Sequence, residues 1–226
     1  RSSIIQNDHQ IKDQSIIRIT LLNTMRRILL SITLLSAMVI PSLGLQAVAP
    51  FDGKFIALDA GHGGTESGAV NTTHNLLEKD VNFEVVKVLQ AKLEAAGATV
   101  VLTREGDETI SSRKERIEIA QAKCKAKGKE CDVLVSVHHN YSSSPATDGT
   151  LVIYNEKQDK PLAQALLNSL VAKLGTQNLG LENGGFGITV YGHLVSALTE
   201  AYYLTNDSEA QQYMFGTRKE DEAQAT

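Results

Sequence analysis

Short apolar runs alternate with longer stretches of helical periodicity from residue 54 onwards. The apolar runs are typical of buried strands, and they lie at residues 54–59, 99–103, 132–138, 150–154 and 195–200. The periodic stretches predict helices at residues 78–96, from a cap at Ser111 or Ser112 to residue 127, at residues 161–174, and from about residue 208. Strands that alternate with helices predict an α/β fold.

The end of the chain has weaker signals. Asn206 or Asp207 can cap the last helix, and the charged segment KEDE at residues 219–222 predicts that its outer face is solvated. Residues 180–192 are rich in glycine and lack periodicity, so we predict a loop with a short strand near Ile188.

The N-terminal segment differs from the rest of the chain. Residues 25–49 have the layout of a secretory signal peptide: a methionine and two arginines, an apolar run at residues 28–40, and then small residues. The run is shorter than the roughly 20 residues of a permanent membrane helix. We therefore expect cleavage near residues 47–49, export to the periplasm or the extracellular cell wall, and no stable membrane span afterwards. Residues 1–24 are expected to be absent from the mature protein.

Length and charge narrow the class of protein. The chain of 226 residues is long enough for one full-sized domain, which we place at residues 53–226 and expect to be monomeric. Without residues 1–47 the chain keeps 17 basic and 24 acidic residues. Because no basic field remains, we expect no nucleic-acid partner.

The two cysteines, Cys124 and Cys131, flank the lysine-rich segment KAKGKE. In an exported chain they can close a small disulfide loop, and the alternative is two free thiols. Since the chain has no further cysteine to complete a thiolate zinc site, we expect no metal-binding role for them.

Open α/β sheets collect functional residues at the carboxyl ends of their strands, and four polar residues stand out there: His62, Glu78, His138 and Glu200. Two imidazoles and one carboxylate are the ligands of a hydrolytic zinc site that keeps a fourth position open for water. His62 lies in a glycine-rich turn with little core to pack on, which favours a ligand role. Glu200 would then be the general base.

Each of the other assignments has an alternative at this point. Glu78 opens a predicted helix, where a carboxylate also complements the helix dipole. His138 and His139 are adjacent on one strand, so they face opposite sides and only one can reach a metal. Glu200 lies in a mostly apolar strand, where a buried carboxylate needs a partner, but it can also face solvent at the strand end.

Motifs of three other enzyme classes are absent. The chain contains no H-E-x-x-H, no G-x-x-x-x-G-K-[ST] and no G-x-S-x-G segment. The first is typical of metalloproteases, the second of nucleotide-binding P-loops and the third of serine hydrolases. The second and third absences disfavour a nucleotide phosphate site and a serine hydrolase.

Six segments in unbroken order resemble the zinc-dependent N-acetylmuramoyl-L-alanine amidases of the amidase 3 type. They read LDAGHGGTESGAV, LLEKDVNFEVV, VLTREGDE, ERIEIAQ, VLVSVHHN and TEAYYLTNDSEA. The resemblance implies a single α/β domain with a mixed, mostly parallel central sheet flanked by helices. It places the Zn²⁺ ligands on His62, Glu78 and His138, which selects His138 over His139, and the catalytic glutamate on Glu200. The implied substrate is peptidoglycan, at the amide between N-acetylmuramic acid and L-alanine.

The chain departs from the family pattern in one segment. Before the catalytic strand the family has a basic residue and a proline, whereas this chain reads ITVYGHLVSAL. Between His138 and residue 150 there is no long insertion that could form a blocking helix, so we expect an open groove. Two alternative functions are a zinc peptidase that cuts the stem peptide and a catalytically inactive wall-binding module.

Overall fold

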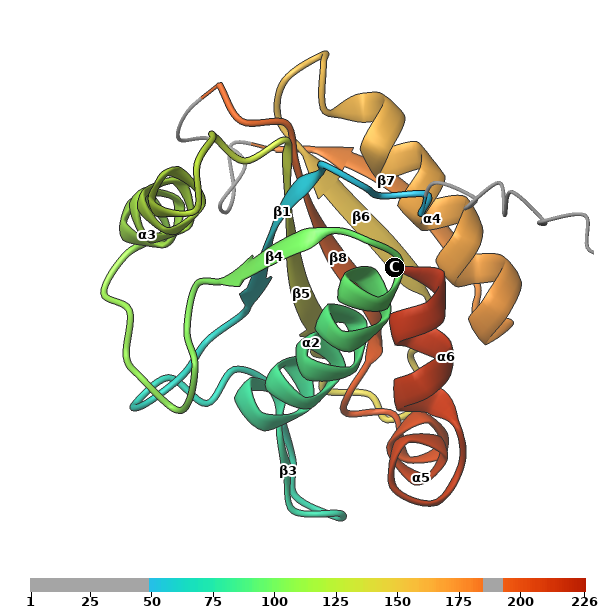
Figure 1. The fold of residues 1–226 in the computed structure, drawn as a ribbon. Coiled ribbons are helices and arrows are strands. Elements are labelled where there is room, and N and C mark those ends of the chain that lie inside the picture. Colours follow the sequence, from blue (N-terminus) through green and yellow to red (C-terminus); the bar gives the residue numbers. More distant parts are fainter. Residues whose placement is uncertain (1–48, 185–192) are drawn as a thin grey trace, which may run out of the picture. The chain divides into compact units, whose positions relative to one another are not determined.

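The computed structural model describes residues 49–184 and 193–226. At its centre is a six-stranded sheet in the order β4-β1-β5-β8-β6-β7 (Figure 1). The strands are β1 (Phe55–Ala60), β4 (Thr99–Leu102), β5 (Val133–Asn140), β6 (Thr150–Tyr154), β7 (Asn178–Asn183) and β8 (Ser196–Tyr203). Neighbouring strands are parallel except β6 and β8, which are antiparallel. The prediction of an α/β fold with a mixed, mostly parallel sheet is confirmed.

The helices begin and end close to the predicted positions. They are α2 (Glu78–Ala95), α3 (Arg113–Ala126), α4 (Lys160–Leu174), α5 (Asp207–Phe215) and α6 (Arg218–Ala225), and a small hairpin of β2 (Val70–Asn71) and β3 (Leu76–Leu77) precedes α2. Ser112 caps α3 by accepting the N–H of Glu115, and Asn206 caps α5 by accepting the N–H groups of Ser208 and Glu209. These caps satisfy backbone donors that have no partner within the helix.

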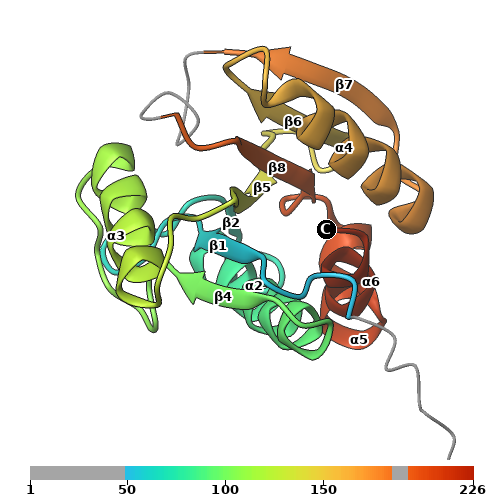
Figure 2. The same cartoon turned by 45° about the horizontal axis from the view of Figure 1, so that its top comes forward.

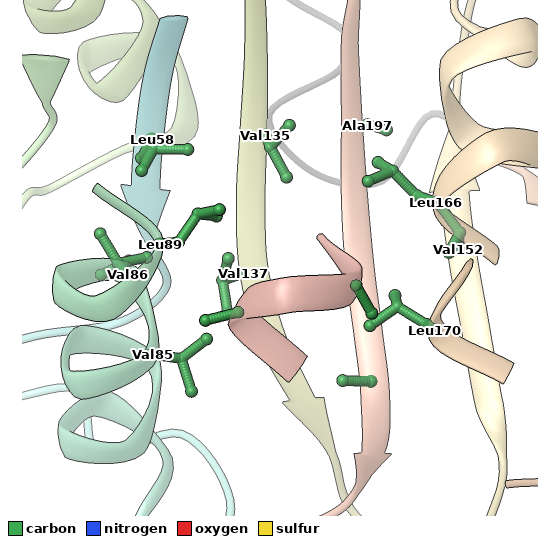
Figure 3. Close-up of a cluster of buried hydrophobic side chains, with 14 of the residues drawn as sticks. Leu58, Val85, Val86, Leu89, Val135, Val137, Val152, Leu166, Leu170 and Ala197 are labelled. Atoms are coloured by element: carbon green, nitrogen blue, oxygen red, sulfur yellow. The ribbon is translucent and has the colours of Figure 1, made fainter. Parts of the chain in front are cut away.

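The helices cover the two faces of the sheet unequally. Helices α2, α4 and α6 pack on one face, whereas α3 is the one described helix that packs on the other (Figure 2). The first face carries the larger apolar cluster, in which strand residues meet side chains of α2 and α4 (Figure 3). Its members include Leu58, Val85, Val86, Leu89, Val135, Val137, Val152, Leu166 and Leu170. The smaller cluster joins α3 to β1, β4 and β5.

A disulfide joins Cys124, near the end of α3, to Cys131, just before β5. Their Cα atoms are 5.4 Å apart and both residues are buried. The disulfide interpretation is confirmed, and the bridge fixes α3 against its own face of the sheet.

Two predictions at the end of the chain are wrong. Residues 180–183 belong to β7, an edge strand whose mostly exposed side chains give only a weak apolar pattern. The last helix is divided near Gly216, and α6 then packs against α2 and α4. This packing leaves Glu222, in the segment expected to be solvated, fully buried.

Other predictions fall outside the described residues. They are the upstream segment, the signal peptide up to residue 48, and the strand near Ile188. Within residues 49–184 and 193–226, none of the helices combines the length and the apolar character that crossing a membrane requires.

Candidate metal centre

His62 lies in the glycine-rich turn directly after β1. Its backbone has φ 60°, a left-handed conformation that is uncommon for a residue with a side chain, and Gly63 follows with φ 132°. Arg116 supports this conformation by donating from Nη2 to the carbonyl of His62 at 2.8 Å. The turn also requires Gly61, because a Cβ atom there would collide with the ring of His138. The turn thus brings two imidazoles together.

Glu78 is the first residue of α2, and its side chain is buried. Its Oε2 accepts the N–H of Ala69 at 2.7 Å, and its Oε1 accepts the N–H of His139 at 3.1 Å and Nδ2 of Asn82 at 3.2 Å. Two of these three donors lie outside α2. The carboxylate is therefore fixed against the end of the sheet, which an interaction with the helix dipole alone would not require.

The side chains of His62, Glu78 and His138 meet at this end of the sheet. Nε2 of His62 is 3.1 Å from Oε2 of Glu78, and Nδ1 of His138 is 2.9 Å from Oε1 of the same carboxylate. One ligand atom of each residue lies within 4.8 Å of the others. Two imidazole nitrogens and one carboxylate oxygen in this arrangement can hold a divalent metal ion.

Glu78 is held in its charged form. Burial alone raises the pKa of its carboxyl group, but hydrogen bonds and charge interactions with His138 and His62 outweigh burial and hold the pKa well below its usual range. A metal ligand must be deprotonated, so this carboxylate already has the form that a cation requires.

Glu200 lies on β8 directly beside His138 of β5 in the register of the two strands. Burial raises the pKa of Glu200 to about 7. The charge of Glu78 also raises this pKa, whereas that of His138 lowers it. Among the described residues, its buried Oε2 has no hydrogen-bond partner. A buried carboxylate oxygen without a partner is unfavourable, and a cation or a proton donor of a ligand would satisfy it.

A groove of about 600 Å³ opens beside these residues, on the face of the sheet that carries α3. Its lining includes His62, His138 and Glu200, apolar side chains of Ile153 and Leu198, and residues 111–114 at the start of α3. Residues 141–149, between β5 and β6, contain no helix, in keeping with the expected absence of a blocking helix.

His139 faces the opposite side of the sheet and is buried there. Its ring contacts Asn82 at 2.7 Å and Glu222 at 2.9 Å. The two alternatives that the sequence left open thus have different surroundings: His138 lies beside Glu78 in the groove, and His139 lies among the packed helices.

A buried ion pair that the sequence pattern did not reveal lies beneath the turn of His62. Arg116 Nη1 and Asp59 Oδ1 are 2.8 Å apart, and Arg116 also donates to the carbonyls of Ala60 and His62. Burial raises the pKa of Asp59, but Arg116 and hydrogen bonds from neighbouring hydroxyl groups outweigh it and lower the pKa. The sequence signal for this pair was a charged residue at a core position in each of two elements, Asp59 in the first strand and Arg116 in the second predicted helix.

Comparison with known proteins reveals the family. The profile of the family described as N-acetylmuramoyl-L-alanine amidase matches residues 56–226. The chain belongs to this amidase family. The resemblance carried by the six segments is confirmed.

Relatives of this amidase family include two proteins of Bacillus subtilis (strain 168). The N-acetylmuramoyl-L-alanine amidase LytC is 34% identical over 184 residues, which are 80% of this chain and 35% of LytC. The uncharacterized protein YqiI is 34% identical over 169 residues, which are 73% of this chain and 77% of YqiI. The chain thus spans about a third of the length of LytC.

Solved structures of amidases have the same fold. The catalytic domain of the amidase CwlV from Bacillus (Paenibacillus) polymyxa var. colistinus matches with a TM-score of 0.68 and 28% identity, over 76% of this chain and 93% of that one. An N-acetylmuramoyl-L-alanine amidase from Clostridium difficile 630 matches with a TM-score of 0.69 and 28% identity, over 76% and 91% of the two chains. The single α/β domain is thus that of an amidase catalytic domain.

Proposed function

We propose that this protein hydrolyses the amide bond between N-acetylmuramic acid and L-alanine in peptidoglycan. His62, Glu78 and His138 hold a Zn²⁺ ion in this proposal, and Glu200 is the general base. The observation that carries it is the convergence of these three ligand atoms within 4.8 Å, next to Glu200 in an open groove. Membership of the amidase family supports the choice of bond.

The donor atoms fit zinc. Imidazole nitrogen and carboxylate oxygen are ordinary zinc ligands, and three protein ligands with an open position are typical of catalytic rather than structural sites. His62 and His138 both line the groove, so a metal ion that they held would lie beside the space that a substrate would enter. A bound divalent ion supplies Lewis-acid polarisation of the scissile carbonyl and of the attacking water.

Glu200 performs the proton transfers in this proposal. Its carboxylate takes a proton from the attacking water and passes it to the amine of L-alanine as the C–N bond breaks. A pKa raised to about 7 by burial suits both steps near neutral pH, because the group is then an effective base and its conjugate acid an effective donor. The positive charge of a bound metal ion nearby would favour the ionised form of Glu200.

The groove suits an extended substrate with both polar and apolar parts. Ile153 and Leu198 offer apolar surface beside the reacting centre, and residues 111–114 offer hydroxyl and basic groups. Such a substrate lies outside the cytoplasmic membrane, so the proposal includes export by the signal peptide at residues 25–49 and action as a monomer in the periplasm or the extracellular wall.

The deciding experiment is digestion of purified peptidoglycan, read by mass spectrometry with and without a chelator. We expect peptides with L-alanine at their N-terminus and intact glycan strands. Neither product should form when the chelator has removed the metal. Cleavage inside the stem peptide would instead identify a zinc peptidase.

An inactive wall-binding module would bind peptidoglycan without releasing any product. A co-sedimentation assay on the same substrate separates this outcome from a failed digestion. Binding without hydrolysis by a protein that holds its metal would contradict the proposal.

A further inference from the structure

A chain of buried hydrogen bonds leads from Glu78 to the C-terminal helix. Asn82 donates from Nδ2 to Oε1 of Glu78 at 3.2 Å, and Oδ1 of the same amide lies 2.7 Å from Nδ1 of His139. On the far side of that ring, Nε2 lies 2.9 Å from Oε2 of Glu222 in α6. Asn82 and Glu222 are fully buried and His139 is 2% exposed, so solvent does not compete for these bonds.

Which atoms donate in these hydrogen bonds follows from the groups that can only accept. Nδ2 of Asn82 also lies 3.2 Å from the carbonyl of Gly61, which can only accept, so Nδ2 must point toward Gly61 and Glu78. Oδ1 then faces His139, and Nδ1 of this ring must carry a hydrogen. The ring is thus held from both sides, by Asn82 and by Glu222.

His139 is also tied to the candidate metal centre through its backbone. Its N–H donates to Oε1 of Glu78 at 3.1 Å, and the preceding residue is His138. The ring of Tyr202 packs against the imidazole with centroids 4.4 Å apart. A displacement of the His139 ring would therefore move one bond to Glu78 directly and a second through Asn82.

We propose that Asn82, His139 and Glu222 are positioning residues that orient the carboxylate of Glu78 for metal binding, so that the docked helix α6 sets the metal affinity of the site. This inference rests on the proposed function, since it takes Glu78 to be a metal ligand. Replacing buried ionic groups by apolar side chains of the same volume is often neutral or stabilising. We therefore expect this row of hydrogen bonds to serve a purpose other than stability. Hydrogen-bonding partners of metal ligands commonly change metal affinity or activity by 10–100-fold when removed.

The test measures the zinc dissociation constant by competition with a chromophoric chelator, at a temperature where every variant is folded. Asn82→Ala is expected to weaken zinc binding by about 10–100-fold and Glu222→Ala by about 10-fold. With saturating zinc, kcat should fall while KM for a soluble peptidoglycan fragment stays unchanged, because the groove itself is intact.

Two conservative variants separate position from charge. Glu222→Gln keeps the length and a hydrogen bond to His139, and it should restore zinc affinity to within about 3-fold of the wild type. Glu222→Asp keeps the charge but withdraws it by one methylene group, and it should weaken zinc binding by about 3–10-fold. If Glu222→Ala does not fold, the comparison of these two variants still decides the matter.

Matched controls account for general destabilisation. Leu170→Ala removes buried apolar atoms on α4, and Glu220→Ala removes an exposed charge on α6 itself. Both should leave the zinc dissociation constant within about 2-fold. The double variant Asn82→Ala/Glu222→Ala should weaken zinc binding by less than the product of the two single effects, because Glu222 acts in part through the amide of Asn82.

The outcomes distinguish this inference from the proposed function. Wild-type protein that binds no zinc would overturn the proposed function. Wild-type protein that binds zinc, together with Asn82 and Glu222 variants of unchanged affinity, would overturn only the positioning role. Effects of the two single variants that add fully in the double variant would also overturn it.

Discussion

The two faces of the central sheet differ in what they carry. Under α2, α4 and α6, the strands present the apolar residues of the larger cluster, and on the opposite face α3 covers β1 and β4 while β5, β6 and β8 line the groove. Adjacent residues of β5 illustrate the difference, because His138 lies in the groove and His139 lies among the packed helices. Because side chains alternate along a strand, two adjacent residues are enough to place one side chain in the groove and the next in the core.

Because the two faces carry different groups, they should respond separately to substitution. Changes on the groove face should affect chemistry and leave folding intact. Changes on the packed face should affect folding and leave chemistry intact, except where the polar chain through His139 joins the two.

The largest expected effect comes from the groove face. Glu200→Gln removes the base but keeps the shape of the side chain, so release of peptide from peptidoglycan should fall by about 10²–10⁴-fold. Zinc content and the midpoint of thermal unfolding should not fall. A variant with wild-type turnover would rule out Glu200 as the base.

Leu170→Ala is the matching change on the packed face. Leu170 is fully buried in the larger cluster, and truncation should lower the free energy of unfolding by about 2–5 kcal/mol, as measured by urea titration. At a temperature where the variant is folded, peptide release should equal that of the wild type. A loss of activity in the folded variant would mean that the two faces are not independent.

A smaller effect is expected from the disulfide behind the groove. Replacing both Cys124 and Cys131 by Ser should cost about 2 kcal/mol of stability, because the bridge closes a short loop in the unfolded chain. Urea titration of the double variant under non-reducing conditions measures this cost. Equal stability of the two proteins would contradict a stabilising role for the bridge.

The last prediction concerns how the stability of the metal-free protein depends on pH. The pKa of Glu200 is about 7 in the folded state against an ordinary value of 4.5, so the folded state binds more protons between these values. The stability of the folded state should therefore fall as pH rises from 4.5 to 7.

Glu200→Gln isolates this contribution from other titrating groups. The variant, stripped of metal by a chelator, should be more stable than the wild type at pH 8 and equally stable at pH 4. Parallel pH profiles of the two proteins would contradict the assignment of a raised pKa to Glu200.

The sequence predicted most of the fold because the core strands carry strong apolar patterns. The edge strand β7 was missed because its side chains are mostly exposed, and the buried position of Glu222 was missed because a charged segment ordinarily lies in solvent. Only the tertiary contact of α6 with α2 and α4 supplies its partner, His139.

The candidate site was named from residue types and from the family resemblance. Periodicity placed His138 and His139 on opposite faces but did not say which face held the site. Spacing along the chain likewise gave no distance between His62, Glu78 and His138. The support around them, such as the pair of Asp59 and Arg116, depends on contacts between distant segments and had no local signal beyond charged residues at core positions.

The most direct test of the account is the number of zinc ions bound per molecule, measured by equilibrium dialysis and elemental analysis of the wild type, His62→Ala and Glu200→Gln. We expect one ion in the wild type, one in Glu200→Gln and none in His62→Ala at micromolar free zinc. A wild type that holds no zinc, or a His62→Ala variant that still holds one ion with wild-type affinity, would contradict it.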